Sequence, residues 1–307
     1  MRIRSKKFYP IIKLSQREAI AFYFLILPWL IGFILFTIYP IGATIYYSLT
    51  EYNGVQAKFT GISNYIELVS DDKFYKSLSV TLKYASISVP LNTFLALSVA
   101  IVLNQKVPFL SFWRTIFYLP SVLSGVAVAL LWKWILDPQF GIVNYILLRL
   151  LGIQGPRWFY SEHWVIPSYW IMGIWGIGGA IVIYLAALQS IPTILYEAAE
   201  IDGANAWGRF RYITFPSISP VILFTLITNL IFALRTFTQV SVISEGGRGG
   251  PNNASLFYVL YLFQNAFHWS RMGYASALAL VLCLVTLILT LCMFRVSNRL
   301  VYYEYTK

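Results

Sequence analysis

Six long apolar stretches constrain this chain more than any other feature of its sequence. A helix needs about 20 mostly apolar residues to cross the hydrocarbon core of a membrane. The stretches are approximately Ala19–Leu49, Ser79–Leu103, Ser111–Leu136, Trp164–Ile191, Ser219–Ile243 and Tyr274–Val296. Charged residues make up only 11% of the chain, whereas a soluble domain carries about 25%. The sequence therefore predicts an all-α membrane protein with six transmembrane helices in one domain, residues 19–296.

Basic residues predict how these helices are oriented, because Lys and Arg are retained on the cytoplasmic side of a membrane. Six of them precede the first apolar stretch: Arg2, Arg4, Lys6, Lys7, Lys13 and Arg17. We therefore expect the N-terminal tail, residues 1–18, to be cytoplasmic. Six crossings would return the C-terminal tail, residues 297–307, to the same side. The first stretch is longer than a signal-peptide core and lacks a small-residue cleavage site, so we expect it to be retained.

The sequence lacks the motifs of the common enzyme classes. There is no G-x-x-x-x-G-K-[ST] phosphate loop, no H-E-x-x-H and no G-x-S-x-G. Both cysteines, Cys283 and Cys292, lie in one apolar stretch, which argues against a disulfide framework or a metal site. The net charge of +11 is interpreted as membrane topology, because no soluble basic domain remains to bind nucleic acid. We expect a chain without enzyme activity, cofactor or metal of its own.

The segment Tyr196–Pro216 (YEAAEIDGANAWGRFRYITFP) is unusually polar for this chain. Ile194–Asp202 is predicted to be a short helix with a small-residue face, formed by Leu195, Ala198, Ala199 and Asp202 at helical spacing. Glu197 and Glu200 are expected in its first turns, near the positive end of the helix dipole. Gly203 is expected to end this helix, and Asn205 to cap a second one.

Six crossings place this segment in the cytoplasm, between the fourth and fifth transmembrane helices. One interpretation is an amphipathic hairpin that lies on the inner membrane surface. The other is a hairpin that docks into another protein, which the small-residue face favours.

The same segment resembles the EAA loop of ABC-importer permeases. The family pattern is EAA, three residues, G, nine residues, I, one residue and LP. Glu197-Ala198-Ala199, Gly203, Ile213 and Pro216 match it in spacing, and Phe215 stands where the family usually has Leu. The wider stretch is similar to the carbohydrate-uptake branch, which includes the maltose and glycerol-phosphate permeases. Four other stretches agree in order: RTIFYLP, GIVN, the glycine loop at residues 245–251, and GYASA.

The resemblance implies a type I importer fold and a subunit of a larger assembly in a bacterial or archaeal cell membrane. The partners implied are a second, different permease, two cytoplasmic ATPase subunits that bind ATP and Mg, and an extracytoplasmic sugar-binding protein. By residue match, the coupling residues would be Glu197, Ala198, Ala199, Asp202 and Gly203. The function implied is ATP-driven uptake of a sugar, expected to be an oligosaccharide, by alternating access. The alternative is an ATP-independent carrier or channel whose hairpin only anchors it to the membrane.

Polar residues in the fifth apolar stretch are candidates for a substrate pathway. Thr228, Phe232, Arg235 and Gln239 are predicted on one helical face, with Asn229 beside it. A charge inside a membrane is costly and usually faces protein or water, so Arg235 is the strongest candidate. Alternatively, Arg235 extends to the outer interface or binds a structural carbonyl. In the fourth stretch, the glycines of Gly176–Gly179 predict close helix packing, and Ile142–Leu151 predicts an external helix on the membrane surface.

Overall fold

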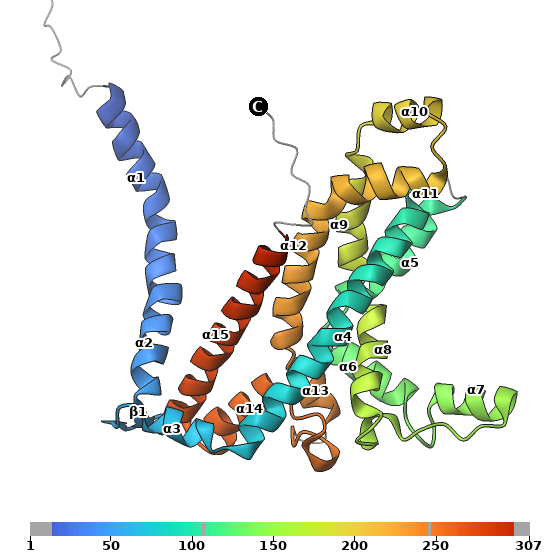
Figure 1. Cartoon of the computed structure of the whole chain (residues 1–307). Helices are drawn as coiled ribbons and strands as arrows, with labels where there is room; N and C mark the ends of the chain where they lie inside the picture. Colours follow the sequence, from blue (N-terminus) through green and yellow to red (C-terminus); the bar gives the residue numbers. More distant parts are fainter. Residues whose placement is uncertain (1–13, 106–107, 245–246, 298–307) are drawn as a thin grey trace, which may run out of the picture.

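The computed structural model describes residues 14–105, 108–244 and 247–297. These residues form a bundle of helices with one small two-stranded antiparallel sheet (Figure 1). The elements are α1 (Leu14–Phe33), η1 (Ile34–Ile38), α2 (Tyr39–Ser48), β1 (Thr50–Tyr52), β2 (Ala57–Phe59), α3 (Ser63–Val69), α4 (Asp72–Leu103), α5 (Leu110–Val122), α6 (Gly125–Ile135), α7 (Ile142–Leu151), η2 (Trp158–Tyr160), α8 (Val165–Trp175), α9 (Gly178–Gln189), α10 (Thr193–Ile201), α11 (Ala206–Arg209), η3 (Phe210–Thr214), α12 (Phe215–Leu234), α13 (Thr238–Ile243), η4 (Pro251–Asn253), α14 (Tyr258–Phe263), η5 (Gln264–His268) and α15 (Met272–Ser297).

Four helical runs are long and apolar enough to cross a membrane: Glu18–Ser48, Asp72–Leu103, Ala206–Ile243 and Met272–Ser297. Two pairs of shorter helices also qualify when each pair is taken together. The pair α5 and α6 is bent by 102°, and the pair α8 and α9 by 47°. The predicted six spans are confirmed if each bent pair counts as one span.

The third and fourth stretches are each divided into two helices, and the fifth is interrupted at residues 235–237. Between α5 and α6 the backbone of Leu123 is extended, and the side chain of Ser124 accepts a hydrogen bond from the amide of Ala127 at 3.3 Å. A serine in this role begins a new helix. In the fifth stretch, α12 ends at Leu234, and α13 begins only at Thr238.

The two ends of the bundle differ. The start of α1, the end of α15 and the hairpin of α10 and α11 lie at one end, at the top of Figure 1. The strands, α3, α7 and α14 lie at the opposite end. This arrangement agrees with an even number of crossings. The predicted tails lie mostly outside the described residues, and so do residues 245 and 246 of the predicted glycine loop.

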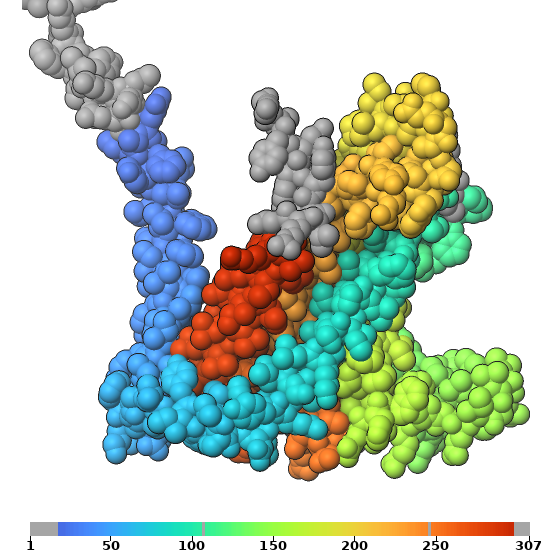
Figure 2. All heavy atoms as spheres, viewed as in Figure 1, coloured from blue at the N-terminus to red at the C-terminus, as the bar shows by residue number. Residues whose placement is uncertain are grey.

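Two buried clusters hold the bundle together. The larger one, toward the end opposite the hairpin, contains the rings of Tyr84, Phe257 and Tyr169. The rings of Tyr84 and Tyr169 each pack edge-to-face with Phe257, at centroid distances of 5.1 and 5.5 Å. The second joins α4, α9 and α12 through small residues such as Ala96 and Ala100, both completely buried. By contrast, α1 contributes no buried residue among those whose burial is described, and Figure 2 shows it apart from the other helices.

Close packing at Gly178 confirms one prediction for the fourth stretch. A Cβ atom at this position would lie 2.4 Å from the carbonyl oxygen of Phe117 and 2.9 Å from the Cα atom of Tyr118. Only glycine allows α9 to approach the backbone of α5 so closely. Gly179, the next residue, has nothing within 4 Å of such an atom.

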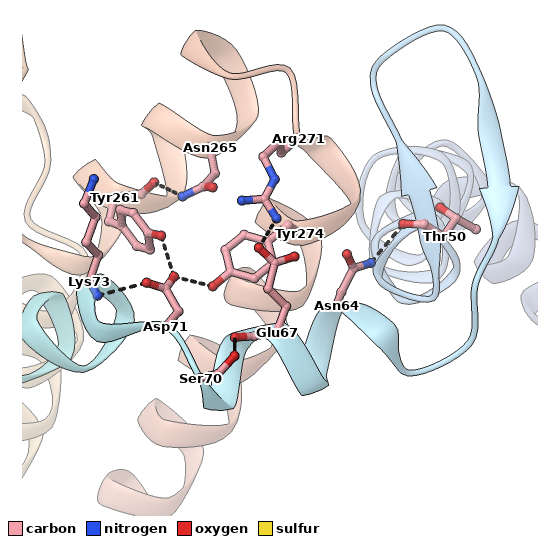
Figure 3. Close-up of polar contacts among 10 residues, drawn as sticks. All are labelled: Thr50, Asn64, Glu67, Ser70, Asp71, Lys73, Tyr261, Asn265, Arg271 and Tyr274. Carbon is pink, nitrogen blue, oxygen red and sulfur yellow. Dashed lines mark hydrogen bonds and ion pairs between the residues drawn. The ribbon is translucent and has the colours of Figure 1, made fainter.

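A polar cluster, the Asp71 clasp, joins α3, α4, α14 and α15 at the end opposite the hairpin (Figure 3). The Asp71 carboxylate accepts hydrogen bonds from the hydroxyls of Tyr261 and Tyr274, both at 2.5 Å, and from the amide of Lys73 at 2.9 Å. Glu67 and Arg271 form an ion pair beside it. Burial alone would raise the pKa of the Asp71 carboxyl, but these hydrogen bonds hold the pKa below its usual value.

Candidate functional site

The predicted hairpin projects from one end of the bundle as two short helices (Figure 1). Helix α10 spans Thr193–Ile201 and agrees with its predicted bounds to within one residue. None of its residues is buried. Four of the five predicted coupling residues, Glu197, Ala198, Asp202 and Gly203, are exposed, and Ala199 is half-buried. All five therefore lie together on a surface that another protein can reach.

The turn after α10 has a defined backbone geometry. Gly203 has a φ of +76°, as predicted for the residue that ends the helix. The amide of Gly203 donates to the carbonyl of Glu200 at 3.1 Å, and the amide of Ala204 donates to that of Ala199 at 2.8 Å. This pair of bonds is a Schellman motif, which satisfies the last carbonyls of a helix and favours glycine at the left-handed position.

The second helix of the hairpin is capped and tied to the first. The side chain of Asn205 accepts a hydrogen bond from the amide of Gly208 at 2.7 Å, which confirms the predicted cap. The expectation that Glu197 and Glu200 lie in the first turns is wrong, because α10 begins at Thr193 and has no acidic residue in its first turn. Glu200 lies near the end of α10 and forms an ion pair with Arg209 of α11.

The hairpin continues directly into a membrane span. Helix α11, the π-helical turn η3 and α12 follow one another without a break from Ala206 to Leu234. At 1.5 Å per residue this run is on the order of 40 Å long. Tyr196 of α10 also meets this run, since its hydroxyl lies 2.9 Å from Oγ1 of Thr214. The hairpin is therefore joined to the fifth span both by the continuous helical run and by this contact.

The far end of this helical run borders a cavity of about 560 Å³. Its walls come from α4, the α5–α6 bend, α8, the end of α12 and the start of α13. Polar and aromatic side chains of the wall include Tyr84, Ser88, Asn92, Ser121, Trp175, Asn229, Phe232, Arg235 and Gln239. A smaller neighbouring cavity of about 310 Å³ shares Asn92, Ser121, Asn229 and Phe232 with it.

The predicted pathway residues gather around these two cavities. Asn229, Phe232, Arg235 and Gln239 line the larger cavity, and Thr228 lines the smaller one. The prediction of one helical face is wrong for Gln239, which lies on α13 beyond the break in the helix. Gln239 nevertheless lines the same cavity as Asn229, Phe232 and Arg235, because the helix is interrupted between α12 and α13.

Arg235 is the C-cap residue that directly follows the end of α12 at Leu234. Its side chain is exposed, lines the larger cavity and also borders a separate, mainly apolar cavity. Within the described part of the chain it forms no ion pair, since the two ion pairs found there join other residues. Arg235 therefore borders the larger cavity, and its role in a substrate pathway stays a prediction.

Other cavity residues lie outside the predicted pathway set. Ser88 and Asn92 lie four residues apart on α4 and face the same cavity. Polar residues at this spacing inside an apolar stretch share one helix face, and this signal was available in the sequence. Ser121 lies just before the bend between α5 and α6. Its position in the wall depends on that bend, which we did not predict from the sequence.

Comparison with known proteins identifies the family. Residues 72–302 match the family described as "Binding-protein-dependent transport system inner membrane component". The chain belongs to this family. It is thus an inner membrane component with several membrane-spanning helices, in agreement with the predicted location.

Similar members of this family cover nearly the whole chain. "Probable ABC transporter permease protein YesP" of Bacillus subtilis is 40% identical over 94% of each chain. "Lactose transport system permease protein LacF" of Rhizobium radiobacter is 36% identical over 84% of this chain and 88% of that one. "Trehalose/maltose transport system permease protein MalF" of Thermococcus litoralis is 32% identical over 93% and 96%.

A solved structure confirms the importer fold. A chain of a bacterial ABC transporter involved in the import of the acidic polysaccharide alginate superposes with a TM-score of 0.81. The superposition covers 93% of this chain and 98% of that one, at 24% sequence identity. The bent helix pairs and the projecting hairpin thus belong to a permease fold of the ABC-importer type, as the resemblance of the EAA segment implied.

Proposed function

We propose that this chain is a transmembrane permease subunit of an ATP-driven importer that takes up a saccharide by alternating access. Relatives at 31–36% identity carry the names of lactose, trehalose/maltose and arabinooligosaccharide transport systems. The two neighbouring cavities offer amide, hydroxyl and aromatic groups, which are the groups that bind sugars. Their combined extent favours an oligosaccharide over a single sugar unit.

The continuous run from the hairpin to the cavity is the observation that carries the proposal. In this reading, the face containing Ala198 and Ala199 docks on a cytoplasmic ATPase subunit, which binds ATP and Mg. Closure of the ATPase subunits moves α10, and the rod from Ala206 to Leu234 passes this movement to the cavity wall. Exposed apolar side chains on the hairpin, among them Ile201 and Trp207, support a protein contact there.

We assign each end of the bundle to one side of the membrane, and the remaining partners are proposed from that assignment. The hairpin end, with both ends of the described chain, faces the cytoplasm. The opposite end faces the binding protein. The similar alginate transporter has been solved in complex with a periplasmic protein bound to an alginate pentasaccharide. The exposed apolar side chains of α1 lie against a second, different permease subunit or against lipid. ATP hydrolysis takes place in the separate ATPase subunits and not in this chain.

A charge reversal in the hairpin tests the coupling. Glu197→Lys changes an exposed carboxylate on α10, and Glu51→Lys makes the same change at an exposed position on β1, at the opposite end. We expect Glu197→Lys to reduce both the ATPase subunits that co-purify with the permease and ATP-dependent uptake. Glu51→Lys should leave ATPase co-purification intact. Uptake that continues without ATP would contradict the proposal and favour an independent carrier.

A further inference from the structure

Among the described residues, the wall of the larger cavity carries a positive charge and no negative charge. Arg235 is the one charged residue in its wall, and the smaller neighbouring cavity has none. No acidic residue among the described ranges lines either cavity. The ion pairs found there, Glu200 with Arg209 and Glu67 with Arg271, lie at the two ends of the bundle. The guanidinium of Arg235 therefore has no carboxylate partner in the described chain.

An unpaired arginine within a membrane protein is costly. Ionisable residues in membrane segments are rare, they face the protein interior or a water-filled cavity, and they mark substrate or ion pathways. A guanidinium carries several donors in a planar fork, which suits a carboxylate or a phosphate better than a neutral hydroxyl. Asn92, Asn229 and Gln239 in the same wall supply neutral groups suited to sugar hydroxyls.

A further cavity, closer to the hairpin, also has an arginine and an amide side chain but no described acidic residue in its wall. It measures about 450 Å³ and lies between α5 and α9. Arg114 and Gln189 line it, again without any described acidic residue. Both lie at the hairpin end of their helices, because α10 follows α9 directly and α5 begins at Leu110. Two cavities lined by the fourth span, one along α8 and one along α9, thus present arginine and amide groups, a combination that favours an anion with hydroxyl groups.

We propose that the saccharide carried by this transporter is anionic, bearing a carboxylate or a phosphate that Arg235 binds in the larger cavity. This inference rests on the proposed function as a saccharide importer and adds the charge of the cargo. The anion supplies the opposite charge that the cavity wall lacks. The neutral amides and Trp175 hold the sugar ring beside it.

The test is uptake by the complete assembly, with its binding protein, in proteoliposomes. The probes are matched neutral and uronate oligosaccharides of glucose, galactose and mannose, together with the corresponding sugar 6-phosphates. The variants are Arg235→Gln, Arg235→Lys and, as a matched control, Lys83→Gln. Lys83 is an exposed cation on α4 that lines none of the cavities described above. Losing its charge therefore leaves the cavity wall unchanged.

We expect at least one anionic probe to be taken up ten times faster than its neutral counterpart. A uronate or a sugar phosphate as the preferred probe would identify which anion the cavity accepts. Arg235→Gln should reduce this uptake tenfold or more, Arg235→Lys should restore part of it, and Lys83→Gln should leave it unchanged. Equal or faster uptake of neutral probes, or equal effects of Arg235→Gln and Lys83→Gln, would overturn the inference while the importer function stands. ATP-dependent uptake of no saccharide at all would contradict both.

Discussion

The turn at Gly203 allows a quantitative test of the docking hairpin. A residue with a side chain costs about 1–2 kcal/mol in the left-handed conformation that Gly203 adopts at φ +76°. Nothing lies within 4 Å of a Cβ atom added there, so the cost of Gly203→Ala comes from the backbone alone. A change of 1–2 kcal/mol corresponds to a factor of about 5–30 in an equilibrium constant. We therefore expect ATPase docking to weaken by about this factor.

Two further variants separate docking from general stability. Gly203→Asn should retain more function than Gly203→Ala, because asparagine tolerates the left-handed region best after glycine. Gly152 ends α7 at the opposite end of the bundle, with a φ of +65° and nothing within 4 Å of an added Cβ atom. Gly152→Ala should therefore cost similar stability without affecting docking.

The assays are ATPase co-purification, ATP-dependent uptake in proteoliposomes, and the thermal unfolding midpoint of the purified assembly. We expect similar midpoints for Gly203→Ala and Gly152→Ala, but a loss of docking and uptake only in Gly203→Ala. The reasoning is refuted if both alanine variants dock equally well, or if Gly203→Asn is as defective as Gly203→Ala.

Two other predictions concern the stability of the bundle. Asp71→Asn should lower the free energy of unfolding by about 2 kcal/mol, since it removes the charge that accepts two tyrosine hydroxyl bonds; thermal unfolding of the assembly measures this. Because the pKa of Asp71 is lowered in the folded state, its stabilisation is present above about pH 4 and lost as the pH falls through the lowered pKa. A contribution of Asp71 to the free energy of unfolding that falls as the pH rises from 5 to 7 would contradict this prediction. Gly178→Val should cost about 1–3 kcal/mol or more, because its Cβ atom would lie 2.4 Å from the carbonyl of Phe117. The matched Gly179→Val, which has open space, should leave the amount of folded protein in the membrane nearly unchanged, and equal losses in both variants would show that the packing argument is wrong.

Local signals in the sequence were sufficient to predict the bounds of α7 and the helix–turn–helix arrangement of the hairpin. The bounds of Ile142–Leu151 were predicted without error, and those of α10 to within one residue. Gly203 and Asn205 were assigned their roles correctly because caps depend on residues within one turn of the helix end. The expected place of Glu200 in the first turns was wrong because α10 has only nine residues, so Glu200 lies next to its last residue.

The sequence by itself determined the number of apolar segments and the polar hairpin between the fourth and fifth of them. Hydropathy and capping act within a few residues, so they can be read along the chain. Only the tertiary structure decided the 102° and 47° bends, the end of α12 at Leu234, and the hydrogen bonds of the Asp71 clasp. These features depend on which distant backbones and side chains pack against each segment. The cavity exists because of those contacts, and it brings residues of α4, α12 and α13 to one wall.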